Sequence, residues 1–324
     1  MSIPLIDLEP WFRGTDGDRA LLARRVDRHL QDVGFLVVTG HEVDLGLVAE
    51  LRDAVRRFFA LAPEVKARYV ATGEFYAGYL PAGAEANAAA YGGSAAPDLK
   101  ETFAAGPVDP PADLVAAAPR FYGPSIWPEE VPELRPLQEE FVRQATALAD
   151  ALLVLLAMAL DAPPDTLLDK CRNPIITTSF NWYPSLRTLG TAPAADQYRI
   201  GPHTDYGTLT ILDRQQGMGG LEVLVHGEWE PAPWVDGALT VNTGLCMQRW
   251  SNRRWVANEH RVLAPPDADP DEELVSLIYF HDPQHDSVIE PLPGCVDEDH
   301  PAQYAPVLAG AHLGALLDAI VVPT

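Results

Sequence analysis

The stretch that decides the fold is Gly201-Pro-His-Thr-Asp-Tyr-Gly-Thr-Leu-Thr-Ile-Leu212, in which a histidine and an aspartate stand two residues apart. The β-formers at its end predict a strand. Because side chains alternate between the two faces of a strand, we expect His203 and Asp205 to point to the same side. An imidazole and a carboxylate on one side supply two of the three ligands of the 2-His-1-carboxylate site that holds non-haem Fe(II).

A third ligand is available at His260, which begins another candidate strand in Asn258-Glu-His-Arg-Val-Leu263. By itself, a histidine and an aspartate at this spacing often occur by chance at the polar end of a strand. A jelly roll, however, brings separate strands together, and a facial metal site takes its third ligand from a neighbouring strand. We therefore predict that His203, Asp205 and His260 bind the metal and form the catalytic centre. Other histidines are expected in surface turns and loops: His226, His281 and His285.

The pattern along the chain changes from mainly helical in the first half to mainly β in the second. Helices are expected over 18–32, 44–61, 137–160 and 310–320, with early strands near 3–8 and 34–40. Short runs of β-formers between Gly, Pro, Asn and Asp predict strands at 175–183, 207–213, 221–225, 228–231, 238–243, 260–264 and 274–280. This many short strands predict a β-sandwich or a jelly roll.

Residues 72–125 are rich in Ala, Gly and Pro, with aromatic residues between them. Long segments of weak periodicity often cover functional sites, although a mobile excursion without that role is an equally good explanation. We expect the part over 75–103 to lie over the metal centre. Packing of Tyr76, Tyr79 and Phe103 against the rest of the protein is an equally good explanation of the aromatic residues.

The composition limits the partners of the protein. The 324 residues carry a formal net charge of −23, which disfavours nucleic acid and anionic membranes because both need a basic surface. The most apolar stretch, 151–160, has about half the length of a bilayer-spanning helix and is expected to be buried. We predict a small-molecule substrate and no nucleic-acid or membrane partner.

The cysteines and the N-terminus favour a cytoplasmic location. Cys171, Cys246 and Cys295 are odd in number and far apart, without a CxxC pair. They therefore predict neither a disulfide framework nor a zinc knuckle. The opening Met-Ser-Ile-Pro-Leu-Ile-Asp lacks the basic region and apolar run of a secretory signal.

The sequence resembles the Fe(II)/2-oxoglutarate-dependent oxygenases, in the isopenicillin-N-synthase-like branch. His203-Thr-Asp205 with the distal His260-Arg-Val262 is similar to the iron-binding signature of that family. Further segments match in family order: Ile3-Pro-Leu-Ile-Asp-Leu8, Gly34-Phe-Leu-Val-Val-Thr-Gly-His41, Gly78-Tyr79, Asp98-Leu-Lys-Glu-Thr-Phe103, Gly106-Pro107, Trp127-Pro128, Asn181-Trp-Tyr-Pro184, Gly219-Gly-Leu-Glu-Val223, Val241-Asn-Thr-Gly244 and Gln248-Arg-Trp-Ser-Asn252. Each match is weak singly, but their order makes the resemblance specific.

The resemblance implies a fold that is mainly β with α. Its core would be a double-stranded β-helix (jelly roll) over 173–290 that binds Fe(II). A helical and strand region over 1–172 and a C-terminal helical extension over 291–324 would wrap this core within one integrated domain.

The resemblance also implies that Fe(II) binds to the predicted ligands and that 2-oxoglutarate and O2 are co-substrates. In the family, an Arg-x-Ser pair on the last strand holds the far carboxylate of 2-oxoglutarate. A tyrosine in an Asn-x-Tyr segment helps to hold it. The residues that match these segments and are expected to bind the cosubstrate are Asn181, Tyr183 and Ser276.

One position departs from the family pattern. The Arg-x-Ser pair reads Leu274-Val-Ser276, so the expected arginine is missing. A charged hydrogen bond contributes about 1.5–3 kcal/mol, and a buried carboxylate without its cation costs roughly 3–5 kcal/mol. At about 1.4 kcal/mol per factor of ten, the affinity for the cosubstrate would fall about a hundred- to a thousandfold unless another group replaces the arginine.

Three explanations for Leu274 remain open. Another arginine takes the position, the site takes a different oxo acid or reductant, or all electrons come from the substrate, as in isopenicillin N synthase. The arginines near the relevant strands in sequence are Arg187, Arg199, Arg254 and Arg261.

The leading prediction is a 2-oxoglutarate-dependent oxygenase that oxidises a C–H bond of a small organic substrate by hydroxylation, desaturation or cyclisation. One alternative is an isopenicillin N synthase-like oxidase that works without 2-oxoglutarate. The other is a non-catalytic member of the fold that binds a small molecule or a partner.

Overall fold

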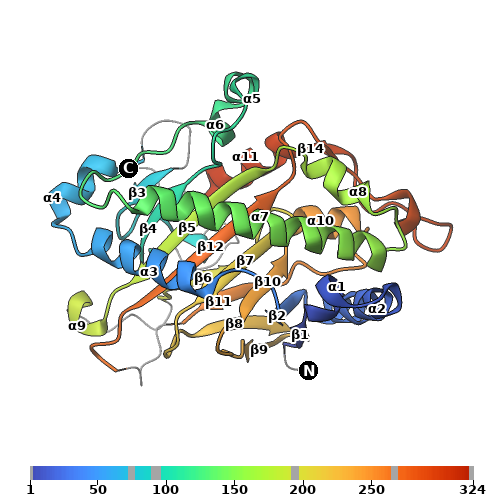
Figure 1. Ribbon diagram of the computed structural model, residues 1–324, viewed down its shortest axis with the longest axis horizontal. Coiled ribbons are helices and arrows are strands. Elements are labelled where there is room, and N and C mark those ends of the chain that lie inside the picture. Colours follow the sequence, from blue (N-terminus) through green and yellow to red (C-terminus); the bar gives the residue numbers. More distant parts are fainter. Residues whose placement is uncertain (1–2, 72–76, 89–95, 191–196, 264–268, 321–324) are drawn as a thin grey trace.

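The computed structural model describes residues 3–71, 77–88, 96–190, 197–263 and 269–320. Its strands form a large sheet in the order β1-β2-β10-β7-β12-β5-β4-β3 and a smaller sheet in the order β6-β11-β8-β9, while β13 pairs with β14 (Figure 1). The strands are β1 (Leu5–Asp7), β2 (Phe35–Thr39), β3 (Gly78–Leu80), β4 (Glu101–Ala105), β5 (Ile175–Tyr183), β6 (Ile200–His203), β7 (Leu209–Arg214), β8 (Leu221–Val225), β9 (Glu228–Pro231), β10 (Leu239–Thr243), β11 (His260–Val262), β12 (Leu274–Asp282), β13 (Val288–Ile289) and β14 (Val307–Leu308). The helices are α1 (Glu9–Arg13), α2 (Asp16–Asp32), α3 (Leu45–Phe59), α4 (Pro63–Lys66), α5 (Ala112–Ala117), α6 (Pro119–Tyr122), α7 (Leu134–Ala159), α8 (Asp165–Leu168), α9 (Leu186–Leu189), α10 (Leu245–Trp250) and α11 (Ala309–Ile320), with 3-10 turns η1 (Ala67–Tyr69), η3 (Asp169–Cys171) and η4 (Pro293–Cys295).

Strand β12 lies inside the large sheet, antiparallel to β5 on one side and to β7 on the other. Leu277 and Tyr279 are 0% exposed and belong to the main apolar core, which also contains residues of α3 and α7. Ser276 and Phe280 alternate with them and line a cavity on the opposite face. Since a slip of one residue would exchange the two faces, the apolar pattern of β12 fixes which side chains reach the interior.

Helix α7 crosses the outer face of the large sheet and packs beside α2 and α3 (Figure 1). Its second half is apolar on nearly all sides, as expected for a helix with neighbours all round. By length and composition it could span a bilayer, but 56% of the relevant stretch is buried inside the protein. The prediction that 151–160 belongs to a buried helix is confirmed, and this helix begins at Leu134 where the sequence predicted a start at 137.

Both sheets contribute to a second apolar cluster, which contains Phe35 of β2, Tyr183 of β5 and Val223 of β8. The two sheets therefore pack face to face, as predicted for a jelly roll, and no described strand belongs to both. The N-terminal region also enters the large sheet, because β2 pairs with β10 and β4 with β5. The domain boundaries at 172 and 290 stay a prediction.

Local sequence signals located most elements to within a few residues. Helix α3 begins after Asp44, whose carboxylate accepts the Gly46 N–H at 2.8 Å and caps the helix as predicted. Strands β5, β8 and β9 have the predicted bounds. The early helix is also present, and Thr15 and Asp18 cap it by reciprocal hydrogen bonds in a capping box.

The prediction that His226, His281 and His285 lie at the surface is confirmed only in part. His226 is exposed in a turn, as expected. The expectation for His281 was wrong, because β12 continues past Phe280 to Asp282 and leaves His281 0% exposed. Its Nδ1 lies 2.9 Å from the hydroxyl of Tyr279 in the core.

Candidate active site

The three predicted metal ligands lie where the chain passes between the two sheets. His203 ends β6, and His260 begins β11 as its direct antiparallel partner in the small sheet. Asp205 lies in the connection from β6 to β7. The prediction that His203 and Asp205 share a strand was therefore wrong, since the chain leaves the small sheet after His203 and enters the large one.

The side chains of these residues nevertheless converge. Asp205 Oδ1 lies 3.8 Å from His203 Nε2 and 3.7 Å from His260 Nε2, and ligand atoms of all three lie within 4.8 Å of one another. Metal bonds of about 2.0–2.2 Å place neighbouring ligands of an octahedron about 3 Å apart. A contraction on the order of 1 Å therefore closes this triangle on a metal ion.

Backbone carbonyls orient the two imidazoles. His203 Nδ1 donates to the Gly201 carbonyl at 2.8 Å, and His260 Nδ1 faces the Asn258 carbonyl at 3.3 Å. A carbonyl only accepts, so Nδ1 carries the proton and Nε2 has a free lone pair for the metal. Burial also lowers the pKa of His260 to about 4, which keeps this imidazole in the neutral, metal-binding form at pH 7.

Two further side chains orient the carboxylate of Asp205. Its Oδ2 accepts hydrogen bonds from Thr210 Oγ1 at 2.5 Å and from Asn242 Nδ2 at 2.7 Å, which leaves Oδ1 for the metal. Burial alone would raise the pKa of Asp205, but the two imidazoles and these hydrogen bonds hold that pKa below its usual value. The sequence analysis missed Thr210 and Asn242 as site residues, although Asn242 lies in one of the family-like segments.

Two imidazole nitrogens and one carboxylate on one face fit Fe(II) and leave the other coordination positions for reactants. When bound, the iron supplies the redox chemistry that activates O2. The protein holds the metal and orients what reacts beside it.

Loss of the hydrogen bond from Asn242 is expected to weaken the site without removing a ligand. We expect Asn242→Ala to lower iron affinity or turnover about 10- to 100-fold, because outer partners of ligating carboxylates contribute about that much. Metal titration and oxygen uptake measure the effect. Asn173→Ala is the control, because Asn173 is exposed and its amide side chain bonds to Gln284, far from the candidate metal ligands; the Tyr122 hydroxyl bonds to its backbone carbonyl, which the change retains. Equal iron affinity in the two variants would contradict the assignment.

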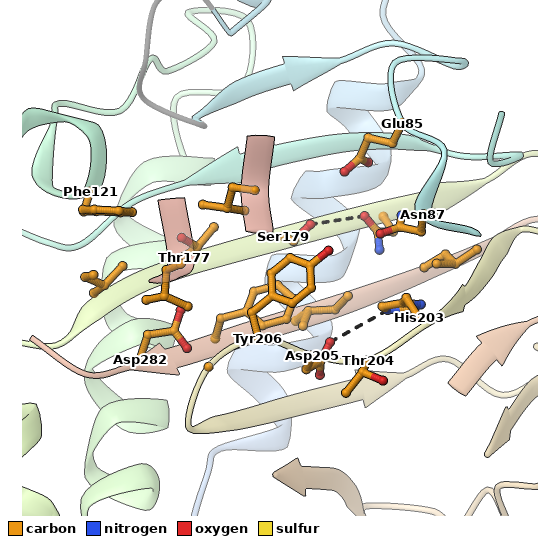
Figure 2. Close-up of a pocket in the computed structure, with 18 of the residues that line it drawn as sticks. Glu85, Asn87, Phe121, Thr177, Ser179, His203, Thr204, Asp205, Tyr206 and Asp282 are labelled. Carbon is orange, nitrogen blue, oxygen red and sulfur yellow. Dashed lines mark hydrogen bonds and ion pairs between the residues drawn. The ribbon is translucent and has the colours of Figure 1, made fainter. Parts of the chain in front are cut away.

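Two cavities meet at the metal site. The first, of about 150 Å³, contains His203 and Asp205 in its wall. Figure 2 shows Tyr206 between this pair and Asp282, which lies toward the other end of the cavity. The second, of about 360 Å³, also reaches His203 and Asp205 and includes His260. The metal position is therefore open to two chambers, which suits a reaction between two organic molecules.

The residues predicted to bind the cosubstrate are divided between the two cavities. Tyr183 and Ser276 line the second cavity, where their hydroxyl oxygens lie 3.1 Å apart. Leu274 is also in its wall. Asn181 lies in the wall of the first cavity and accepts a hydrogen bond from Thr102 at 2.8 Å.

None of the four arginines proposed from the sequence is among the residues that line the two cavities, and each of them lies near a carboxylate. Arg187, Arg254 and Arg261 pair with Asp271, Asp27 and Glu222, respectively, and Arg199 lies 3.8 Å from Glu272. The second cavity does contain an arginine, Arg214, which the sequence analysis missed. The alternation of Thr210, Leu212 and Arg214 along β7 was the signal, but the predicted strand ended one residue too early.

The segment predicted to cover the site contributes Lys100 to the wall of the first cavity, together with Glu85 and Asn87, which Figure 2 labels. Tyr79 and Phe103 instead pack in the main apolar core, which agrees with the alternative that these aromatic residues pack against the rest of the protein. Tyr76 lies outside the described residues.

Comparison with known sequences identifies the family. Residues 180–283 match the model of the 2OG-Fe(II) oxygenase superfamily, and residues 3–130 match that of the non-haem dioxygenase in morphine synthesis N-terminal region. Validamycin A dioxygenase of Streptomyces hygroscopicus subsp. limoneus is 40% identical over 90% of this chain and 80% of its own. A homoarginine-6-hydroxylase of Glycine max is 28% identical over 90% of this chain and 88% of its own.

Solved structures agree in fold. A full-length Neurospora crassa protein, solved in complex with alpha-KG (2-oxoglutarate) and thymine, has a TM-score of 0.85 at 26% identity, covering 98% of this chain and 96% of that one. The predictions of a jelly-roll enzyme that uses Fe(II), O2 and 2-oxoglutarate on a small organic substrate are confirmed. The chain belongs to the 2OG-Fe(II) oxygenase superfamily.

Proposed function

We propose that this enzyme oxidises a C–H bond of a polar ring, carried by a hydroxyl- or amino-bearing small molecule, in the first cavity. The observation that carries the proposal is the set of polar side chains in the wall of that cavity beside the metal ligands. Its polar side chains include Glu85, Asn87, Lys100, Ser179, Asn181, Tyr206 and Asp282. An apolar substrate would deprive any of these groups that bonds to water of that hydrogen bond, at a cost of about 1–3 kcal/mol for each such group.

The size of the cavity limits what enters it. The described residues enclose about 150 Å³. An apolar cavity of about this volume accepts a benzene ring in another protein. A larger substrate therefore places one ring beside the metal and extends the remainder outward.

Asp282 is positioned to recognise a polar substituent of that ring. A Cβ atom on Gly207 would lie 1.3 Å from Asp282 Oδ1, so the carboxyl group occupies space that only glycine leaves free. The Thr208 N–H donates to the same oxygen at 3.3 Å. Burial raises the pKa of Asp282 to about 7, so near neutral pH it can accept from or donate to a substrate hydroxyl.

Validamycin A is the first compound to test, because the 40%-identical relative is named for it. With Fe(II), O2 and 2-oxoglutarate, a true substrate is expected to raise succinate formation well above the uncoupled rate. The mass of the product distinguishes hydroxylation from desaturation or cyclisation. Toluene, an apolar ring of similar size to the cavity, is the matched control. Equal stimulation by toluene and by polar ring compounds would overturn the proposed substrate class.

Asp282→Asn tests the role of the carboxyl group at nearly constant volume. We expect the KM for a polar substrate to rise about 10- to 100-fold, as for the loss of a charged hydrogen bond, while 2-oxoglutarate binding is retained. An unchanged KM for every polar substrate would contradict a contact between Asp282 and the substrate.

We further propose membership of the isopenicillin-N-synthase-like branch, action in the cytoplasm, and no nucleic-acid or membrane partner. The ordered sequence segments support the branch, and the net charge of −23 supports the absence of those partners. Cys171, Cys246 and Cys295 are all free thiols, which suits a reducing compartment. Recovery of the native protein in the secreted or membrane fraction of its source cells would contradict the location.

A further inference from the structure

The second cavity contains one Lys or Arg side chain among the described residues that line it, Arg214. This residue ends β7 and lies directly opposite Ser276 in the antiparallel pairing of β7 with β12. Paired residues in antiparallel strands point to the same face. Arg214 therefore lies beside the serine that the family uses for the cosubstrate, on the strand next to the missing arginine at Leu274.

Side chains on one face of β7 extend from the candidate metal site to the guanidinium of Arg214. Thr210 bonds to the metal-binding carboxylate of Asp205, and Leu212 and Arg214 follow at two-residue steps on the same face. At about 3.4 Å per residue, the Cα atoms of Thr210 and Arg214 lie about 14 Å apart. A five-carbon dicarboxylate and the side chain of an arginine can together span that distance.

Arg214 forms no ion pair with any described carboxylate, although the charge of the adjacent Asp213 raises the pKa of its guanidinium. Its Nη1 and Nη2 donate to the backbone carbonyls of Ala232 and Pro233 at 3.2 and 2.5 Å. Burial lowers the pKa of Arg214 to about 10, so it remains charged at neutral pH. The adjacent Asp213 is engaged with Arg52. A half-buried cation that is fixed in place by carbonyls and forms no ion pair is suited to bind an anion.

Arg199 is the competing candidate, because its guanidinium lies 5.7 Å from the centre of the Tyr183 ring. It is 3% exposed, donates to the Met218 carbonyl at 3.1 Å and lies 3.8 Å from Glu272. Unlike Arg214, it does not contribute to the wall of the second cavity. Arg199 therefore lies behind the residues that line the cavity, where its guanidinium does not contact a bound anion.

We propose that Arg214 binds the far carboxylate of 2-oxoglutarate, together with Tyr183 and Ser276, and so replaces the arginine that Leu274 removes. The inference rests on the cosubstrate that the family uses and is independent of the substrate class proposed above. Arg214 approaches from β7 rather than from β12, so the cosubstrate pocket is re-formed from the neighbouring strand.

The test is an anaerobic titration of the Fe(II) protein with 2-oxoglutarate, followed by its visible charge-transfer absorption and by calorimetry. Arg214→Met is expected to raise the Kd for 2-oxoglutarate about 100- to 1000-fold and to leave iron affinity unchanged. Arg214→Lys keeps the charge but loses the planar, two-pronged donor, so its Kd should fall between those of the native protein and Arg214→Met. A Kd for either variant equal to that of the native protein would overturn the inference.

Two further variants separate the candidates. Arg199→Met is the matched control and should change the Kd less than Arg214→Met does; the reverse order would assign the carboxylate to Arg199 and overturn the proposal. Adding Leu274→Arg to Arg214→Met should recover at least about tenfold in affinity, because it restores a cation to the same pocket. If the native protein bound no 2-oxoglutarate, that result would exclude 2-oxoglutarate as the cosubstrate. A native protein that binds 2-oxoglutarate, with an Arg214 variant that binds it equally well, would exclude only the role of Arg214.

Discussion

Replacing Asp205 by asparagine is expected to lower the rate of 2-oxoglutarate-dependent oxidation more than about 100-fold, because the change removes a metal ligand and even outer-shell changes cost about 10- to 100-fold. The asparagine keeps the volume of the side chain and an oxygen that can accept from Thr210 and Asn242. It removes the anionic oxygen that lies 3.8 and 3.7 Å from the two imidazoles. Iron content and oxygen uptake measure the loss.

Asp297→Asn is the matched control, since Asp297 also lies near a histidine, at 3.1 Å from His300 Nδ1, but this pair is exposed and outside both cavities. The control is expected to retain iron and full activity. Thermal melting of both variants separates loss of metal from loss of fold. A folded Asp205→Asn variant that kept its iron and more than about a tenth of the activity would refute the ligand assignment.

The convergence of the three candidate metal ligands could be predicted from sequence because their chemistry is local. The sequence places two of the candidate ligands beside a run of β-formers and the third at the start of another such run. To bring the three together, the prediction needed only the assumption that the two strands are neighbours. The error in placing Asp205 on a strand was small, because a turn between the sheets directs its carboxylate to the same point. The ligand identities did not depend on that detail.

The cosubstrate end of the pocket could not be predicted in the same way. The position of Arg214 beside Ser276 depends on the register of β7 against β12, two strands that are far apart in the chain. No pattern within β7 encodes that register. His281 shows the same limit, because the pairing of β12 with β5 carries the strand beyond Phe280, where the sequence suggested a loop.

The largest expected effect on stability comes from Lys100 in the wall of the first cavity. Its ammonium group pairs with Glu85 and donates to Thr102 Oγ1 at 2.8 Å, and Asp98 lies close enough to influence its charge. Lys100, Glu85 and Asp98 are 6%, 8% and 4% exposed. Burial alone would lower the pKa of Lys100, but the two carboxylates raise that pKa above its usual value. One cation therefore compensates two buried acids.

Lys100→Met is expected to lower the free energy of unfolding by about 3–5 kcal/mol, because it leaves both carboxylates in the interior without a cation. That is a large part of the roughly 5–15 kcal/mol that stabilises a typical domain. Urea unfolding followed by circular dichroism measures the change. Arg187→Met is the control: its pair with Asp271 is 70% and 63% exposed, and such pairs contribute about 0–1 kcal/mol.

A second substitution shows whether the loss arises from uncompensated charge or from packing. Glu85→Gln in the Lys100→Met background removes one of the two acids, so it should restore a substantial part of the lost stability. Asp98 keeps its hydrogen bonds from Asn87 Nδ2 at 2.6 Å and from the Gly201 N–H at 2.9 Å, which tie the covering segment to the metal-bearing strand β6. Additive losses in the double variant would instead show that Lys100 and Glu85 act independently. Recovery would show that the loss of stability arises from uncompensated charge in the wall of the first cavity rather than from packing.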